Sequence, residues 1–147
     1  MDLYFSDKYS IFKCPETKQS LTSVMLEEEE KITQYLITEG REYKYPVTNG
    51  VPRFVPAENY ASNFGMQWNK FAKTQLDSFS NTTISHDRFW DSTGWKPEEL
   101  KDKWVLDLGC GSGRFAEVAL KAGAYVVALE YSSAIDACNA NLSEYDR

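Results

Sequence analysis

An acidic residue followed by three glycines at alternate positions is the part of this sequence whose residue types could do chemistry. The acid is Asp107, and the glycines are Gly109, Gly111 and Gly113. Glycine lets a backbone turn sharply and approach a ligand closely, and a helix that begins after such a turn offers free N–H groups to an electron-rich ligand. A second acid, Glu130, follows the next apolar run and is placed to accept hydrogen bonds from ribose hydroxyls. This combination predicts a site for a nucleoside cofactor.

The pattern around these residues predicts a strand, a turn, a helix and a second strand. Residues 104–108 form an apolar run with β-branched and aromatic side chains, which is typical of a buried strand. Apolar residues then recur with helical spacing over 115–122, and Gly123 is expected just after the end of that helix. Residues 125–129 predict the second strand, and a serine at 132 or 133 is expected to cap a further helix.

The stretch from Val105 to Gly113 resembles motif I of the class I S-adenosylmethionine-dependent methyltransferases, and Glu130 falls where that family has its ribose-binding acid. The resemblance implies an α/β chain that holds the β-α-β-α start of an incomplete Rossmann-like methyltransferase fold. It also implies S-adenosyl-L-methionine as the cofactor and methyl transfer to an acceptor that the sequence does not identify. The residues that it places at the cofactor are Asp107, Leu108, Gly109, Cys110, Gly111, Gly113, Glu130 and Tyr131.

In that family the glycine loop passes beneath the methionine part of the cofactor. The resemblance therefore implies that Glu130 holds the ribose, and that Asp107 supports the loop or reaches the methionine ammonium group through water. A Rossmann-like unit for another nucleotide is the alternative. The dinucleotide fingerprint G-x-G-x-x-G would need a glycine at position 114, where the chain has Arg114.

Length, charge and cysteine content bound the remaining possibilities. The chain has 147 residues and a net charge of −6, which does not indicate a basic surface for nucleic acid. The sequence has no stretch that approaches the roughly 18 apolar residues of a membrane helix, and its N-terminus lacks the pattern of a signal peptide. Few, widely separated cysteines favour reduced thiols and a cytoplasmic location; they are Cys14, Cys110 and Cys138.

Residues 1–56 are predicted to form a small β-rich module. A hairpin turn is expected at Asn49 and Gly50, which form the strongest two-residue turn pair. Short runs of β-forming residues predict five strands, over 9–13, 21–26, 32–37, 43–47 and 51–55.

Parts of this module are similar to the zinc-ribbon-like modules ahead of bacterial methyltransferases and in the small activator subunit of tRNA and protein methyltransferases. The similarity is carried by Phe12-Lys13-Cys14-Pro15 and by the stretch from Tyr45 to Phe54. Metal-bearing members have a Cys-x-x-Cys pair here, but this chain has Thr17 after Cys14. One thiolate cannot supply the four ligands of a zinc site. We therefore predict a metal-free relative, which is either a docking module for a substrate or partner or a structural cap.

Residues 57–103 are predicted to form a helical linker or cover segment. Its first helix carries aromatic residues at helical spacing, namely Tyr60, Phe64, Trp68 and Phe71. This helix resembles the one that precedes the catalytic core in these methyltransferases and helps to cover the cofactor pocket. Tyr60 and Gln67 are expected to make polar contacts near the cofactor or substrate, whereas Trp68 and Phe71 are expected to pack on the core.

The rest of this segment is predicted to contain a loop at 76–83 and a short helix that ends near Gly94. Ser85 or Asp87 is expected to cap that helix. The single histidine, His86, lies in a polar stretch and is expected at the surface rather than as a catalytic base. The sequence identifies no catalytic residue.

Residues 104–147 are predicted to be the truncated start of the Rossmann-like cofactor domain. A sheet of two parallel strands exposes apolar faces and open edges. We therefore expect the chain to be the N-terminal portion of a longer enzyme, or to be completed by a protein partner or by self-association. The alternative function is a non-catalytic adaptor that stabilises a partner and retains a vestigial cofactor domain.

Overall fold

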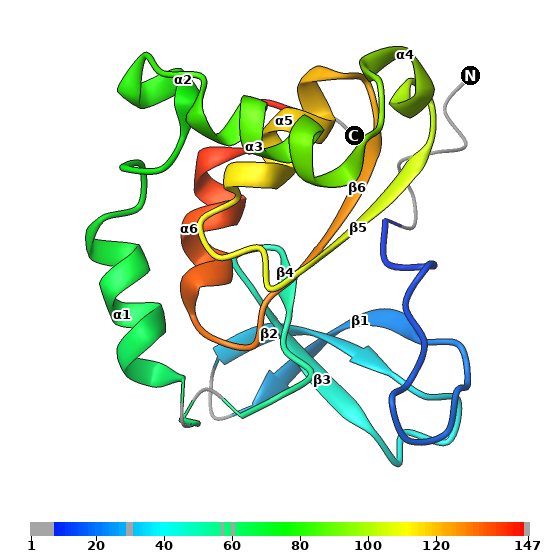
Figure 1. Ribbon diagram of the computed structural model, residues 1–147. Helices are drawn as coiled ribbons and strands as arrows, with labels where there is room; N and C mark the ends of the chain where they lie inside the picture. The colour runs from blue at the N-terminus through cyan, green and yellow to red at the C-terminus, as the bar shows by residue number, and fades with distance from the viewer. Residues whose placement is uncertain (1–7, 29–30, 57, 60, 146–147) are drawn as a thin grey trace. The chain divides into compact units, whose positions relative to one another are not determined.

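The computed structural model describes residues 8–28, 31–56, 58–59 and 61–145 of the chain. The chain divides into two compact units, Met1–Pro56 and Ala57–Arg147 (Figure 1). The first unit contains an antiparallel four-stranded sheet and the second contains a parallel two-stranded sheet, so the protein is a mixed α/β chain. Within the described residues, no helix is both long enough and apolar enough to cross a membrane.

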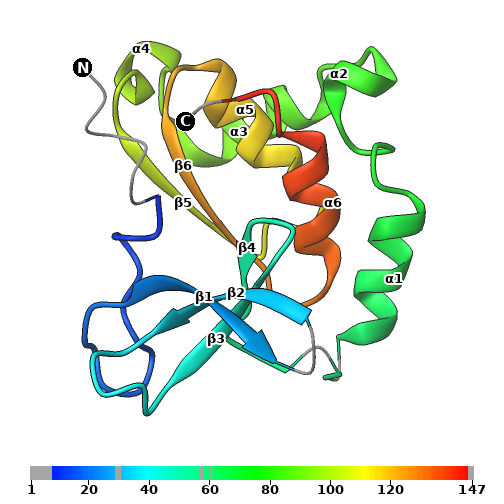
Figure 2. The ribbon, with the colours of Figure 1, turned by 180° about the vertical axis from the view of Figure 1, so that it is seen from behind.

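Four antiparallel strands build the first unit, and they lie in the sheet in chain order (Figure 2). They are β1 (Thr22–Glu28), β2 (Lys31–Ile37), β3 (Lys44–Thr48) and β4 (Val51–Pro52). Asn49 and Gly50 form the turn between β3 and β4, with φ angles of 52° and 78°. Positive φ at both positions is the geometry of a type I′ hairpin turn, so the predicted turn is confirmed.

Two of the five predicted strands differ from the structure. Residues 8–11 form a turn, and only Lys13 of the predicted first strand takes part in an isolated β-bridge. Tyr9 is instead a core residue whose hydroxyl donates a hydrogen bond to the carbonyl of Gly50 at 3.2 Å. The last strand ends at Pro52, although the backbone nitrogen of Arg53 still donates a hydrogen bond to the Pro46 carbonyl of β3 at 2.8 Å.

Cys14 belongs to the core of this unit and is fully buried. Its buried neighbours in that cluster are Tyr9, Leu21, Leu36 and Val47. The Cys14 sulfur lies 3.2 Å from the Tyr45 hydroxyl and 3.5 Å from the backbone nitrogen of Thr17. Burial raises the pKa of the Cys14 thiol, but hydrogen bonds from Thr17 and Tyr45 and from the backbone of Glu16 outweigh burial and lower the pKa to about 7. The thiolate is therefore well populated near neutral pH.

The second unit consists of two parallel strands and six helices within its described residues. The helices are α1 (Ser62–Lys70), α2 (Asp77–Ser80), α3 (Ile84–Thr93), α4 (Pro97–Leu100), α5 (Arg114–Lys121) and α6 (Ala134–Asn141). The strands β5 (Trp104–Leu108) and β6 (Tyr125–Leu129) have the bounds that the apolar pattern predicts. They pair in parallel, and α5 connects them. Gly123, with a φ of 85°, follows the end of α5 as expected.

The apolar side of α5 forms the core of this unit together with the helices that precede β5. Val118 and Ala119 of α5 lie in one buried cluster with Phe89 of α3, Leu100 of α4 and Ala124. This packing places α3 and α5 against each other beside the sheet (Figure 1). The helix that follows the glycines is thereby packed on side chains of α3 and α4.

The segment 76–83, which the sequence predicts as a loop, contains the short helix α2. Asp77 at the start of α2 accepts hydrogen bonds from the backbone nitrogens of Ser85 (3.0 Å) and His86 (2.8 Å). These N–H groups belong to the first turn of α3, which leaves them without intrahelical partners. The cap predicted at Ser85 or Asp87 is therefore supplied by a carboxylate outside the helix.

One face of the β5–β6 pair is apolar and exposed. Three side chains of β5 on this face, Trp104, Leu106 and Leu108, are 64%, 56% and 70% exposed. The face continues on β6 through Tyr125, whose ring stacks on that of Trp104 with centroids 5.3 Å apart. The opposite face of the pair is covered by α5.

The Cys14 thiol leads to a prediction about stability and pH. Its pKa is lower in the folded unit, about 7, than its ordinary value of 9.0. Ionisation therefore favours folding, and this contribution is gained as the pH rises from about 7 to about 9 and lost as it falls back. We expect thermal unfolding followed by circular dichroism to separate wild type from Cys14→Ser more at pH about 9 than at pH about 6. An equal separation at both pH values would show that the thiol stays protonated.

Candidate functional site

The glycine loop, residues 109–113, connects β5 to α5 and is tied to the end of β6. The backbone nitrogens of Gly109 and Cys110 both donate to the carbonyl of Leu129, at 2.8 and 3.1 Å. The N–H of Gly113 donates to the Cys110 carbonyl at 2.9 Å. The φ angles are 77°, 55° and 95° at Gly109, Gly111 and Gly113. All three lie in the left-handed region that favours glycine, so this backbone requires the glycines that the sequence has.

Glu130 lies against this loop at the end of β6. Its Oε2 atom accepts a hydrogen bond from the backbone nitrogen of Gly111 at 3.0 Å. Its Oε1 atom accepts two more, from the backbone nitrogen and the hydroxyl of Ser132, at 2.9 and 2.8 Å. The Ser132 hydroxyl in turn accepts a bond from the backbone nitrogen of Ala134, at the start of α6. The structure thus brings together the glycine loop and the acid that follows β6.

The two sides of the glycine loop differ in what surrounds them. A Cβ atom added to Gly113 would lie 2.8 Å from Cδ1 of Leu142 and 3.0 Å from the sulfur of Cys138, so α6 and the residue after it close that side. A Cβ atom added to Gly109 or Gly111 would meet no atom within 4 Å. The loop therefore packs on α6 through its last glycine and leaves open space at its first two.

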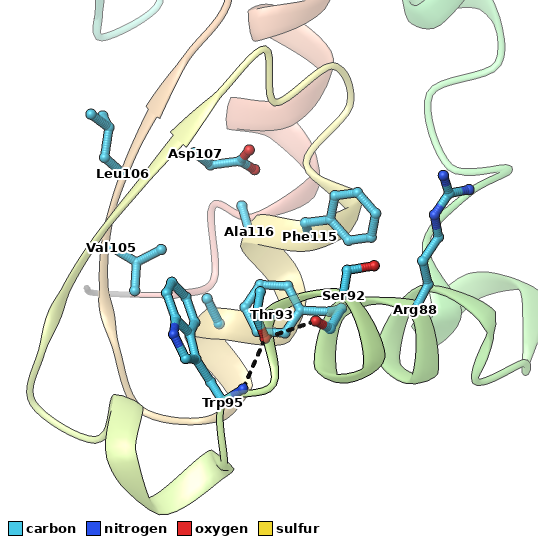
Figure 3. Close-up of a pocket in the computed structure, with 11 residues that line it drawn as sticks. Arg88, Ser92, Thr93, Trp95, Val105, Leu106, Asp107, Phe115 and Ala116 are labelled. Atoms are coloured by element: carbon cyan, nitrogen blue, oxygen red, sulfur yellow. Dashed lines mark hydrogen bonds between the residues drawn. The ribbon is translucent and has the colours of Figure 1, made fainter.

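Asp107 points from β5 toward α5, away from the exposed apolar face on which Leu106 lies (Figure 3). The backbone N–H of Ala116 donates a hydrogen bond to its carboxylate. The other oxygen, Oδ2, is buried and has no hydrogen-bond partner among the described residues. Burial raises the pKa of Asp107, the bond from Ala116 lowers it, and the negative charge of Glu130 raises it further; the net shift is upward. An acceptor without a partner is costly, so this atom is suited to a donor on a ligand.

A cleft of about 360 Å³ lies beside Asp107, between α3, β5 and α5 (Figure 3). Its walls are mostly apolar, with polar groups from Arg88, Ser92, Thr93 and Asp107; the apolar part is made by Phe89, Trp95, Val105, Leu106, Phe115, Ala116 and Ala119. The loop glycines and Glu130 do not line this cleft. Of the residues predicted to bind the cofactor, only Asp107 lines this cleft. The cleft and the glycine loop are therefore two separate features of the structure.

The other predicted cofactor residues are dispersed. The side chain of Leu108 lies on the exposed apolar face, and Cys110 is buried. Tyr131 has an exposed side chain, and its carbonyl accepts a bond from Asn59 Nδ2 at 3.1 Å. Gln67 is exposed on α1, and Tyr60 lies outside the described residues.

The aromatic residues of α1 behave differently from one another. Trp68 is partly buried and contacts Phe64 edge-to-face, with ring centroids 5.7 Å apart. Phe71, which was predicted to pack on the core, is 48% exposed. The helix α1 packs on α6, and Gly65 and Asn69 make close contacts at Ser133, just before α6.

Those contacts involve residues that the sequence analysis did not select. A Cβ atom added to Gly65 would lie 2.7 Å from the backbone nitrogen of Ser133, so the two segments touch closely. Asn69, one turn later, donates from Nδ2 to the Ser133 carbonyl at 2.9 Å. Asn141 of α6 donates to the carbonyls of Ala72 and Ser112. A glycine inside a helical pattern with asparagine four residues later could have indicated such a contact.

No family model, curated protein or solved structure matches this chain. Within the part of the chain that the structure describes, no group of three or more His, Cys, Asp or Glu side chains could hold a metal ion.

Because Gly111 lies in open space and Gly113 packs on α6, replacing each by alanine should lower the free energy of unfolding by different amounts. Gly111→Ala places a side chain at positive φ in open space, which we expect to lower the free energy of unfolding by about 1–2 kcal/mol. Gly113→Ala adds a clash with α6, and we expect a loss of about 3 kcal/mol or more. Urea unfolding of both variants measures the difference. Equal losses would mean that α6 does not close that side of the loop.

The raised pKa of Asp107 predicts that the difference in melting temperature between wild type and Asp107→Asn depends on pH. Because burial raises its pKa in the folded state, the acid favours folding while protonated and loses this contribution as the pH rises through the folded pKa. Asp107→Asn has no such ionisation. We expect the melting temperature of the variant relative to wild type to increase between pH about 3 and pH about 7. A constant difference over this range would contradict a raised pKa.

Proposed function

We propose that this chain binds S-adenosyl-L-methionine through its glycine loop and Glu130, as the cofactor-holding portion of a methyltransferase. The observation that supports this most is the 3.0 Å contact between Glu130 Oε2 and the backbone nitrogen of Gly111. It places a carboxylate beside a glycine turn that ends one strand of a parallel pair and begins a helix. That arrangement is suited to a ribose next to a group that the loop approaches closely.

The residues present fit such a cofactor. A carboxylate oxygen has two lone-pair directions, and Oε2 of Glu130 accepts one hydrogen bond from the described residues. It retains the capacity to accept a ribose hydroxyl without losing its bond to the loop. The open space at Gly109 and Gly111 leaves room for a ligand at the loop, and the buried Oδ2 of Asp107 could accept a bond from an ammonium group or a bridging water.

The roles of the chain in this proposal are binding and orientation. The cofactor, when bound, supplies a methyl group activated by the positive charge on sulfur. Glu130 would hold the ribose and the loop would hold the methionine part, so that the methyl group has a fixed direction. Alignment of this kind supplies much of the rate of a transfer reaction.

A second candidate is a non-catalytic adaptor that binds and stabilises a protein partner. The observation that favours it is the exposed apolar face formed by Trp104, Leu106 and Leu108. Contiguous apolar surface of this kind is typical of protein interfaces. The adaptor would be supported over the enzyme if the chain bound no nucleoside ligand and a pull-down recovered a partner protein in stoichiometric amount.

Isothermal titration with S-adenosylhomocysteine tests the proposed function. We expect wild type to bind it and Glu130→Ala to bind at least about tenfold more weakly, since hydrogen bonds to a charged group are lost. Glu130→Gln keeps one acceptor oxygen and should fall between them. Glu39→Ala removes an exposed acid of the first unit and serves as the control. Tighter binding of NAD or ATP than of S-adenosylhomocysteine, or unchanged binding by Glu130→Ala, would contradict the proposal.

A further inference from the structure

Three side chains at or just after the end of α6 meet residues 110, 112 and 113 of the glycine loop. Cys138 hydrogen-bonds with Cys110, Asn141 bonds to Ser112, and Leu142 just after the helix packs where Gly113 has no side chain. Positions 138, 141 and 142 are three and four residues apart, so they lie on one face of a helix. This face is the surface on which the loop rests.

Asn141 is the member of this set that reaches a second segment. Its Nδ2 atom lies 2.9 Å from the carbonyl oxygen of Ser112 and 2.9 Å from that of Ala72, just after α1. An amide nitrogen carries two hydrogens, so it can donate both bonds at once. A carboxylate of the same shape could donate neither. An asparagine side chain is therefore suited to join two backbone carbonyls, and an aspartate is not.

The direction of the Ser112 carbonyl depends on the hydrogen bonds that the loop makes. Ser112 is only 2% exposed, and it stands between Gly111 and Gly113, both at positive φ. Glycine has little conformational preference of its own, so the direction of the peptide groups around Ser112 depends on their hydrogen bonds. Asn141 fixes the carbonyl of Ser112, and Glu130 fixes the N–H of Gly111.

We propose that Asn141 is a positioning residue for the glycine loop. Because Asn141 also bonds to Ala72, the affinity for the cofactor then depends on the segment just after α1 as well. This inference rests on the proposed function, because it concerns the same loop. Asn141 does not touch the ligand in this proposal. It sets the peptide groups of the loop that do, and it links them to Ala72.

The test compares Asn141→Asp with Asn139→Asp, which makes the same change at an exposed position of the same helix. We expect Asn141→Asp to weaken binding of S-adenosylhomocysteine about tenfold or more at a temperature well below unfolding. The control should bind within about twofold of wild type. Asn141→Ala removes the two donors without adding a charge, and it replaces the aspartate variant if that variant does not fold.

Glycine amide signals provide a readout that needs no ligand. In protein labelled with ¹⁵N-glycine, we expect the Gly111 and Gly113 signals to move in the Asn141 variants, while those of Gly40 and Gly94 stay in place. A lower melting temperature with unchanged affinity and unchanged loop signals would show that Asn141 only stabilises the fold, and would overturn the inference. Failure of wild type itself to bind would contradict the proposed function and the inference with it, and is distinguished by the wild-type titration.

Discussion

The hydrogen bond between the Glu130 carboxylate and the backbone N–H of Gly111 is the interaction on which the candidate site depends. It joins the end of β6 to the turn between β5 and α5, and a charged acceptor makes it stronger than a bond between neutral groups. The same carboxylate accepts two bonds from Ser132, whose hydroxyl accepts a bond from the start of α6. One acid therefore fixes the starts of two helices relative to the ends of two strands. The negative charge of Glu130 also acts on Asp107, where it adds to the effect of burial and raises the pKa of that acid.

Holding three glycines in one conformation is costly, because glycine loses more backbone entropy on folding than any other residue. The chain offsets this cost from two directions. Glu130 and the Leu129 carbonyl hold the loop from β6, while α6 supports it from the side that Gly113 leaves free. None of these supporting groups fills the space beside Gly109 and Gly111, which stays open. A ligand that binds there would meet a turn that has already been ordered, which lowers the entropic cost of binding.

The sequence predicted best the parts whose structure is decided by neighbours in the chain. The bounds of β5 and β6, the turn at Asn49 and Gly50, and the Gly123 helix end each follow from a local pattern. Contacts between distant segments were missed. Asp77 caps α3 from another helix, and an asparagine looks the same in a sequence whether it is solvated or, like Asn141, holds two backbone carbonyls. The strand predicted at 9–13 failed for the same reason, since Tyr9 turns into the core.

The exposed face of β5 has a consequence for how concentrated samples behave. Three large apolar side chains side by side attract the same face of another molecule, while the net charge of −6 keeps molecules apart. Salt weakens the second effect, because the screening length falls to about 10 Å at 0.1 M ionic strength. Sulfate and phosphate also strengthen the burial of apolar surface. Dilute, low-salt buffers therefore suit this chain, and precipitation by ammonium sulfate should begin early.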